Sequence, residues 1–349
     1  MTRPLANFDG FVIDAAQYTK WDRSIFQEMR DGGVTCVNAT LVYWESARET
    51  LSEIGKWNRL FEQNSDLIFL ARTADDIREA KSAGKTAITF AFQHCSPIEE
   101  DIDLIEIMHT LGVRFMQLSY NNQSLCAAGC YEEEDPGITR FGRQVIKEMN
   151  RVGIMVDISH VTDEVINQVL DMTDVPVIAS HSSCRYFTPG WERNMGDDEI
   201  RRLKDNGGVI QINYGSSFVT KASQDKRAAN AEQVKIYAEK NGLSAGDEEL
   251  EKYAKIVNEK NPMYADITEV VDHFDRVVEL AGIDHVAIGS DYDGVGDTLP
   301  YGLKDVASYP NLIYHLLKRG YSEEDIEKIC YKNIWRVWST VEEVAKNKS

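Results

Sequence analysis

The chain has 349 residues, of which 43% are hydrophobic, so it is long enough to bury a large core. Its formal net charge is −19 at pH 7, and a surface this negative is repelled by nucleic acid and by anionic membranes. We therefore expect neither class of partner. A small anionic substrate is still compatible with this charge, because one arginine can reverse the local field in a pocket.

The termini and the cysteines indicate the cellular compartment. The first ten residues, MTRPLANFDG, lack the apolar core of a signal peptide, and no run of 18 apolar residues is present. The last residues, EEVAKNKS, do not resemble a lipid-anchor signal. Six cysteines without a CxxC pair do not make a disulfide framework in a chain of this length. We expect a cytoplasmic protein.

Short apolar runs alternate with stretches of helical period along the chain, and such runs suit strands buried on both faces of a parallel sheet. The runs are 11–15, 34–41, 67–71, 87–93, 113–120, 153–159, 175–181, 207–214 and 285–292. The alternation predicts a (β/α)8 TIM-type barrel, formed as a single domain by residues 1–349. Nine candidates exceed eight strands, so one is peripheral or false, and LIFLA at 67–71 is the weakest.

Residues 219–262 break the alternation, because they are rich in Lys, Glu and Ala and have few apolar anchors. This composition predicts a helical insertion before the last strand of the barrel. Two interpretations of the insertion stay open. It is either a solvated helical face or a lid or subunit contact.

Polar side chains follow the apolar runs at the C-terminal strand ends, where barrel enzymes place their active sites. They include Gln93, Tyr120, Asn121, His160, His181 and Asp291. Neutral imidazole and carboxylate are the usual ligands of a catalytic zinc ion. A lone histidine at a strand end is more often structural, so the spacing alone leaves both a metal site and structural histidines open.

Several long segments resemble the membrane dipeptidase (renal dipeptidase) family of zinc metallopeptidases. They include VGIMVDISHVTDEV, PVIASHSSCR, RNMGDDEIRRLKDNGGV and HVAIGSDYDGV, and the resemblance runs from about residue 10 to about residue 340. The resemblance implies an amidohydrolase-type barrel. It also implies a homodimer or higher homo-oligomer, and a small substrate that carries a carboxylate.

Four site residues of the family are retained here. The resemblance assigns His160 and His181 to one zinc ion and Asp291 to metal binding and proton transfer. It assigns Arg193 to the substrate carboxylate, although a salt bridge to Asp197 or Asp198 is the alternative for this arginine.

Other positions depart from the family pattern. The His-x-Asp pair of the first strand falls on Ala16 and Tyr18, and the bridging glutamate falls on Gln93. The histidine near the scissile carbonyl falls on Tyr120. We therefore expect one zinc ion per chain rather than two, with Gln93 as a neutral third ligand and His94 as a substitute for it.

The predicted function is metal-dependent hydrolysis of a dipeptide or small amide that carries a free carboxylate, through a metal-activated water. Asp291 and Tyr120 are the predicted catalytic residues, and Tyr120 also contacts the substrate together with Arg193, Asn121 and Tyr18. In the structural interpretation, Tyr18 and Tyr120 only fill space left by a missing ion. One alternative function is a non-hydrolytic metal-assisted lyase or isomerase acting on a small carboxylate. Another is a metal-free binding protein.

Overall fold

A computed structural model describes residues 10–17, 21–292 and 294–348 of the chain. Its strands form one parallel sheet in the order β1-β2-β4-β5-β6-β7-β8-β9, and β3 pairs with β4 outside this path. The strands are β1 (Ile13–Gln17), β2 (Cys36–Val42), β3 (Ile68–Leu70), β4 (Thr86–Phe92), β5 (Val113–Gln117), β6 (Met155–Asp157), β7 (Ile178–Ser182), β8 (Val209–Ile212) and β9 (Val286–Ile288). The predicted eight-stranded barrel is confirmed, and the LIFLA run is its peripheral strand.

The barrel is nearly closed, and a buried carboxylate joins its two edges. The backbone N–H of Ser290, just after β9, donates to Oδ1 of Asp14 in β1 at 2.9 Å. The hydroxyl groups of Ser290 and Tyr309 donate to Oδ2 of the same carboxylate. Because Asp14 is fully buried, these donors replace the water that it gives up on folding.

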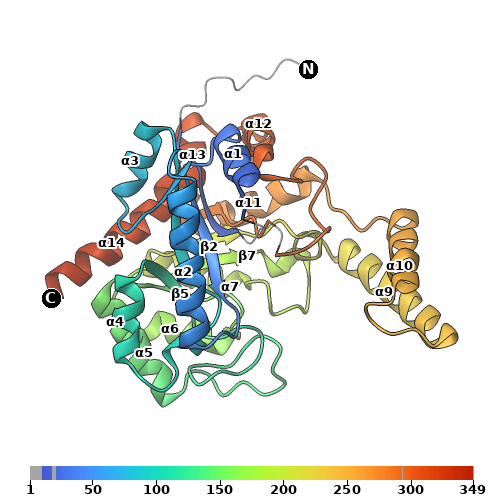
Figure 1. The fold of residues 1–349 in the computed structure, drawn as a ribbon, viewed down its shortest axis with the longest axis horizontal. Helices are drawn as coiled ribbons and strands as arrows, with labels where there is room; N and C mark the ends of the chain where they lie inside the picture. The colour runs from blue at the N-terminus through green and yellow to red at the C-terminus, as the bar shows by residue number, and fades with distance from the viewer. Residues whose placement is uncertain (1–9, 18–20, 293, 349) are drawn as a thin grey trace.

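The helices surround the barrel (Figure 1). They are α1 (Arg23–Asp31), α2 (Ala47–Gln63), α3 (Asp76–Ala83), α4 (Asp103–Thr110), α5 (Arg140–Val152), α6 (Asp163–Met172), α7 (Asp197–Asn206), α8 (Ser216–Val219), α9 (Lys221–Asn241), α10 (Glu248–Lys260), α11 (Ile267–Ala281), α12 (Tyr309–Arg319), α13 (Glu323–Glu327) and α14 (Asn333–Lys348). None of them, in the part of the chain that the structure describes, is long and apolar enough to cross a membrane.

One cluster of buried apolar side chains fills the N-terminal end of the barrel. It takes a residue near the N-terminal end of each barrel strand, for example Cys36, Met155 and Val209, and it also includes Val337 and Val341 of α14. Helix α14 therefore packs against the N-terminal ends of the strands. The C-terminal ends are left for the site, as the fold class requires.

The predicted insertion is present as α9 and α10 between β8 and β9, and Figure 1 shows this helical hairpin projecting from the barrel. The rings of Tyr237 and Tyr253 stack at 3.7 Å and join the two helices. The buried amide of Asn230 donates to Oδ1 of Asn258 at 3.0 Å and to the backbone oxygen of Asn261 at 3.0 Å. Aromatic stacking and the hydrogen bonds of a buried side-chain amide thus hold the hairpin together.

Candidate active site

A cavity of about 410 Å³ lies at the C-terminal ends of the strands. Its lining residues are Tyr43, Gln93, Tyr120, Asn121, Tyr131, His160, His181, Trp191, Arg193, Phe218, Arg227, Asp291, Gly294, Val295 and Gly296. Every site residue predicted from the sequence is in this set except His94, which does not line the cavity, and Tyr18, which lies outside the described residues. Residues that are distant in the sequence are thus brought into one pocket of a size typical for small-molecule binding.

His160 has its proton on Nδ1, because that nitrogen lies 2.7 Å from Oδ1 of Asn121 and a carboxamide oxygen only accepts hydrogen bonds. The unprotonated Nε2 of His160 then carries a lone pair. That lone pair receives an N–H from Nη2 of Arg193 at 2.8 Å. The ring is therefore fixed from both sides.

A second chain of hydrogen bonds fixes His181. The hydroxyl of Ser180 donates to Oδ2 of Asp157 at 2.5 Å, so it accepts from Nδ1 of His181 at 2.7 Å. The Nε2 of His181 is therefore also unprotonated and carries a lone pair. A carboxylate behind the ring through a bridging group is the usual arrangement around metal-binding histidines.

Nε2 of His160 and Nε2 of His181 lie 2.8 Å apart. Burial, and then the charge of Arg193, lowers the pKa of both histidines well below the usual value, so both rings are neutral at pH 7. Because Nε2 of His160 already accepts the N–H of Arg193, a metal ion bound here would take the place of that hydrogen bond. The pair therefore fits one metal ion held by neutral imidazoles.

A carboxylate does not complete this site among the described residues, since no three His, Cys, Asp or Glu side chains in residues 10–17, 21–292 and 294–348 group around a metal position. The ligand role of Asp291 therefore stays a prediction. Gln93 lines the cavity, and its Nε2 donates to Thr40 Oγ1 at 3.2 Å, which leaves the amide oxygen as an acceptor. His94 does not line the cavity, and its Nδ1 accepts from Ser96 N.

Arg193 is buried beside the two histidines and pairs with no carboxylate among the described residues. Asp197 pairs instead with Arg276, and Asp198 pairs with Arg201, so the salt-bridge alternative for Arg193 is wrong. Its Nη1 donates to Ser182 Oγ, while its Nε is buried without a partner. A buried, unpaired N–H on a cation is suited to a carboxylate oxygen of a ligand.

Asp291 is a buried acid at the edge of the cavity. Burial raises its pKa to about 7, against the lowering effects of the Asn213 hydrogen bond and the Arg193 charge. Asn213 Nδ2 donates to Asp291 Oδ2 at 2.9 Å. Gly294 is required beside it, since a Cβ there would meet Asp291 Oδ1 at 2.1 Å. The position of Asp291 is thus fixed from two sides.

Tyr120 stacks on the ring of His160 at 4.3 Å between centroids, and Trp44 meets the outer side of Tyr120 edge-on at 4.8 Å. Burial raises the pKa of Tyr120 above its usual value, so its hydroxyl stays protonated at neutral pH. A neutral phenol in the cavity is a hydrogen-bond donor for developing negative charge.

Three cavity residues hold left-handed backbone conformations, with φ of 63° at Asn121, 68° at His160 and 57° at Asp291. Non-glycine residues in this region cost about 1–3 kcal/mol each and cluster at functional sites. The backbone strain therefore coincides with the residues that carry the predicted chemistry.

Sequence reasoning missed several residues of the site. Asn213 directly follows β8, so the strand-end rule applied to every polar residue would have found it. Ser180 lies in the middle of β7 next to His181, where that rule does not apply. Arg227 lies in α9, inside the segment read as an insertion, and no local pattern marks it.

A parallel barrel with facing imidazoles, a buried acid and a buried arginine at its C-terminal end defines a barrel hydrolase. A family model described as membrane dipeptidase (peptidase family M19) matches residues 11–349. The chain belongs to this family of peptidase-like hydrolases, which normally depend on zinc.

Individual proteins agree with this assignment. An uncharacterized dipeptidase of Schizosaccharomyces pombe is 32% identical over 324 residues, which cover 89% of this chain and 68% of that protein. The dipeptidase verJ of Clonostachys rogersoniana is 34% identical over 305 residues, covering 86% of this chain and 67% of that protein. The solved structure of an amidohydrolase from Pseudomonas aeruginosa is 30% identical with a TM-score of 0.81, covering 96% of this chain and 97% of its own.

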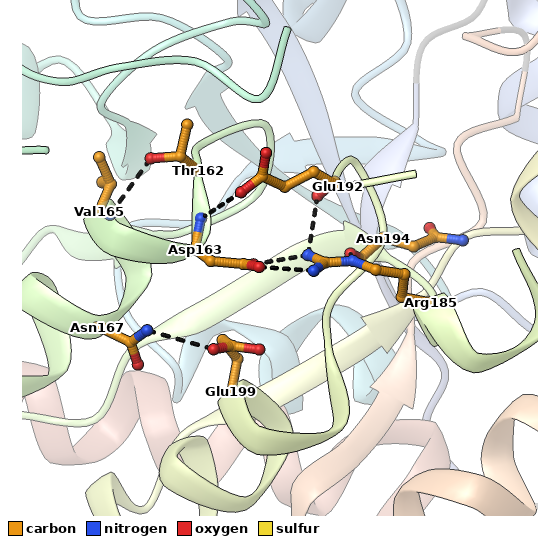
Figure 2. Close-up of polar contacts among 8 residues, drawn as sticks. All are labelled: Thr162, Asp163, Val165, Asn167, Arg185, Glu192, Asn194 and Glu199. Atoms are coloured by element: carbon orange, nitrogen blue, oxygen red, sulfur yellow. Dashed lines mark hydrogen bonds and ion pairs between the residues drawn. The ribbon is translucent and has the colours of Figure 1, made fainter. Parts of the chain in front are cut away.

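A polar network outside the cavity fixes the segment that carries Arg193 (Figure 2). Arg185 donates to both oxygens of Asp163, at the start of α6, with both distances 2.6 Å. Its Nε donates to the backbone oxygen of Asn194 at 2.8 Å, and its Nη2 donates to that of Glu192 at 3.3 Å. Arg185 therefore holds the residues on both sides of Arg193 through a planar fork that lysine lacks.

If Arg193 binds the substrate carboxylate as predicted, Arg185→Lys should raise KM for a carboxylate-bearing dipeptide roughly tenfold with little change in kcat, because such binding stabilises substrate and transition state alike. Steady-state kinetics measure this. The matched control is Arg202→Lys, which alters a guanidinium that links α7 to Asn167 and Asp171 of α6 away from the cavity. An equal rise of KM in both variants would contradict the positioning role.

Proposed function

We propose that the protein hydrolyses a dipeptide or small amide with a free carboxylate, using a metal-activated water. The observation that carries the proposal is the pair of unprotonated Nε2 atoms of His160 and His181, which converge beside the buried cation of Arg193. Family membership supports peptide-bond hydrolysis as the reaction.

In this proposal, Arg193 and the aromatic side chains of Trp191 and Phe218 bind the substrate. The unpartnered Nε of Arg193 donates to the substrate carboxylate in a buried setting, where a charged hydrogen bond is strong. Trp191 and Phe218 line the same cavity and exclude water from that bond. Asn121, which orients His160, also lines the cavity in which the substrate would bind.

Proton transfer is the task of Asp291. Because its pKa is raised to about 7, both protonation states are populated at neutral pH, which suits a group that first accepts and then returns a proton. It takes the proton from the attacking water and delivers it to the leaving amine. The hydroxyl of Tyr120, which stays protonated, donates a hydrogen bond to the oxyanion that forms at the carbonyl oxygen.

The metal site is assigned to His160 and His181, with the neutral amide oxygen of Gln93 as a third donor. A zinc ion bound there would lower the pKa of its bound water to near 7 and so supply hydroxide at neutral pH. The homo-oligomeric state and the cytoplasmic location belong to the same proposal and rest on the resemblance and on composition.

The first test is turnover. The zinc-loaded protein should cleave dipeptides from a set with L or D residues at the second position, and in heavy-oxygen water the new carboxylate should carry the solvent label. The label separates hydrolysis from elimination or isomerisation. Absence of cleavage by the fully loaded protein, or products without label, would rule out the proposed reaction.

The second test is metal content by elemental mass spectrometry. We expect one zinc ion per chain, lost in His160→Ala, and a 10- to 100-fold weaker affinity in Ser180→Ala, because the hydroxyl fixes the tautomer of His181. His315→Ala, which alters a histidine outside the cavity, is the control and should keep its ion. Two ions in the wild type, or none after zinc is supplied, would refute this site.

The third test is the pH dependence of kcat/KM. Deprotonated Asp291 is the base, so kcat/KM should rise with pH through about pH 7. The hydrogen bond from Asn213 favours the charged form and lowers the pKa of Asp291, so Asn213→Ala should move this limb to higher pH. Asn150→Ala, which removes a buried amide elsewhere, serves as the control. An unmoved limb in Asn213→Ala would exclude Asp291 as the titrating base.

A further inference from the structure

A second arginine enters the cavity from outside the barrel. Arg227 belongs to α9 of the projecting hairpin, yet its side chain lines the same cavity as Arg193 and Asp291. Its Nη1 donates to Ser217 Oγ at 3.4 Å. The root of α9 is fixed close by, where Gln224 Nε2 donates to the backbone oxygen of Ser217 at 2.9 Å. Arg227 is an exposed residue, and its hydrogen bond to Ser217 places its guanidinium at the cavity.

The two arginines contact neighbouring residues of one short helix. The guanidinium of Arg193 lies over the ring of Phe218, with 5.0 Å from Cζ to the centroid, while that of Arg227 bonds to Ser217. Both residues belong to α8, and consecutive Cα atoms are about 3.8 Å apart. Two cationic groups therefore face the cavity along one turn of helix.

Among the described residues that line the cavity, the charges are unbalanced toward the positive side. Arg227 forms no ion pair with any carboxylate in the described part of the chain, whereas Lys221 and Lys252 of the same hairpin pair with Asp225 and Glu248. Asp291 is the one carboxylate among the described lining residues. In a chain with a net charge of −19, two guanidiniums that face one carboxylate mark a site for more than one negative charge.

We propose that the site selects dianionic substrates: dipeptides with an acidic residue at the C-terminal position. The α-carboxylate binds to Arg193, and the side-chain carboxylate binds to Arg227. This inference rests on the proposed hydrolase function and names its substrate class. Arg227 is then the specificity-determining residue, and it comes from the hairpin rather than from the barrel.

The experiment compares Ala-Glu with Ala-Gln, each with an L or a D second residue, because the two side chains have nearly the same size and differ in charge. In the wild type, kcat/KM should favour Ala-Glu by roughly tenfold or more, the effect of one charged hydrogen bond. In Arg227→Gln the ratio should fall to about one. Lys226→Gln removes the neighbouring positive charge of α9, which does not line the cavity, and should keep the wild-type ratio.

A binding measurement separates this inference from the hydrolase function. Isothermal titration with glutarate and with its monoamide, glutaramate, reports dianion selectivity without any bond cleavage. Glutarate should bind about tenfold more tightly than glutaramate to the wild type and to Lys226→Gln, but not to Arg227→Gln.

The outcomes are distinct. Glutarate selectivity that depends on Arg227, in a protein that cleaves no dipeptide, would overturn the hydrolase function and uphold the dianion site. If the wild type and Arg227→Gln both cleave dipeptides and show the same ratio of kcat/KM for Ala-Glu to kcat/KM for Ala-Gln, the dianion site is overturned and the hydrolase function is not.

Discussion

The buried carboxylate of Asp14 is the constraint on which the site depends. It joins the first and last strands of the barrel through Ser290, and Ser290 directly precedes Asp291. The charge of Asp14 also raises the pKa of Asp291. One residue therefore closes the fold and favours the protonated form of the group assigned to proton transfer. A residue of the first strand thus contributes to the pKa of a residue that follows the last strand, although the two are 277 positions apart in the sequence.

The tautomer of each of the two histidines is set by the group that binds its Nδ1. Asn121 and Ser180 each bind an Nδ1, and in this way they turn both Nε2 lone pairs toward the same point. Without those partners the rings would be free to adopt either tautomer, and the pair would resemble ordinary buried histidines. The left-handed backbone at His160 and Asn121 shows that this arrangement is maintained against local preference.

The sequence predicted the barrel because alternation of strand and helix is a property of short segments, and each apolar run formed a strand. It also predicted Gln93, Tyr120, Asn121, His160, His181, Arg193 and Asp291 as cavity residues, since strand ends and the family motifs mark them. It did not predict the tautomers, the raised pKa of Asp291 or the entry of Arg227. These follow from contacts between distant segments, such as Asn213 with Asp291, which no local pattern records.

The projecting hairpin separates two properties that most enzymes must optimise together. The groups assigned to bond cleavage are carried by the strands of the barrel and the loops that follow them, whereas Arg227 is carried by a pair of helices joined to the barrel at one end. Substitutions or length changes in the hairpin can therefore alter which molecules are accepted while the cleavage machinery stays intact. For protein engineering, α9 and α10 are therefore a segment that can be varied separately from the barrel. Variant libraries confined to residues 219–262 could change the substrate preference while the barrel residues of the site stay the same.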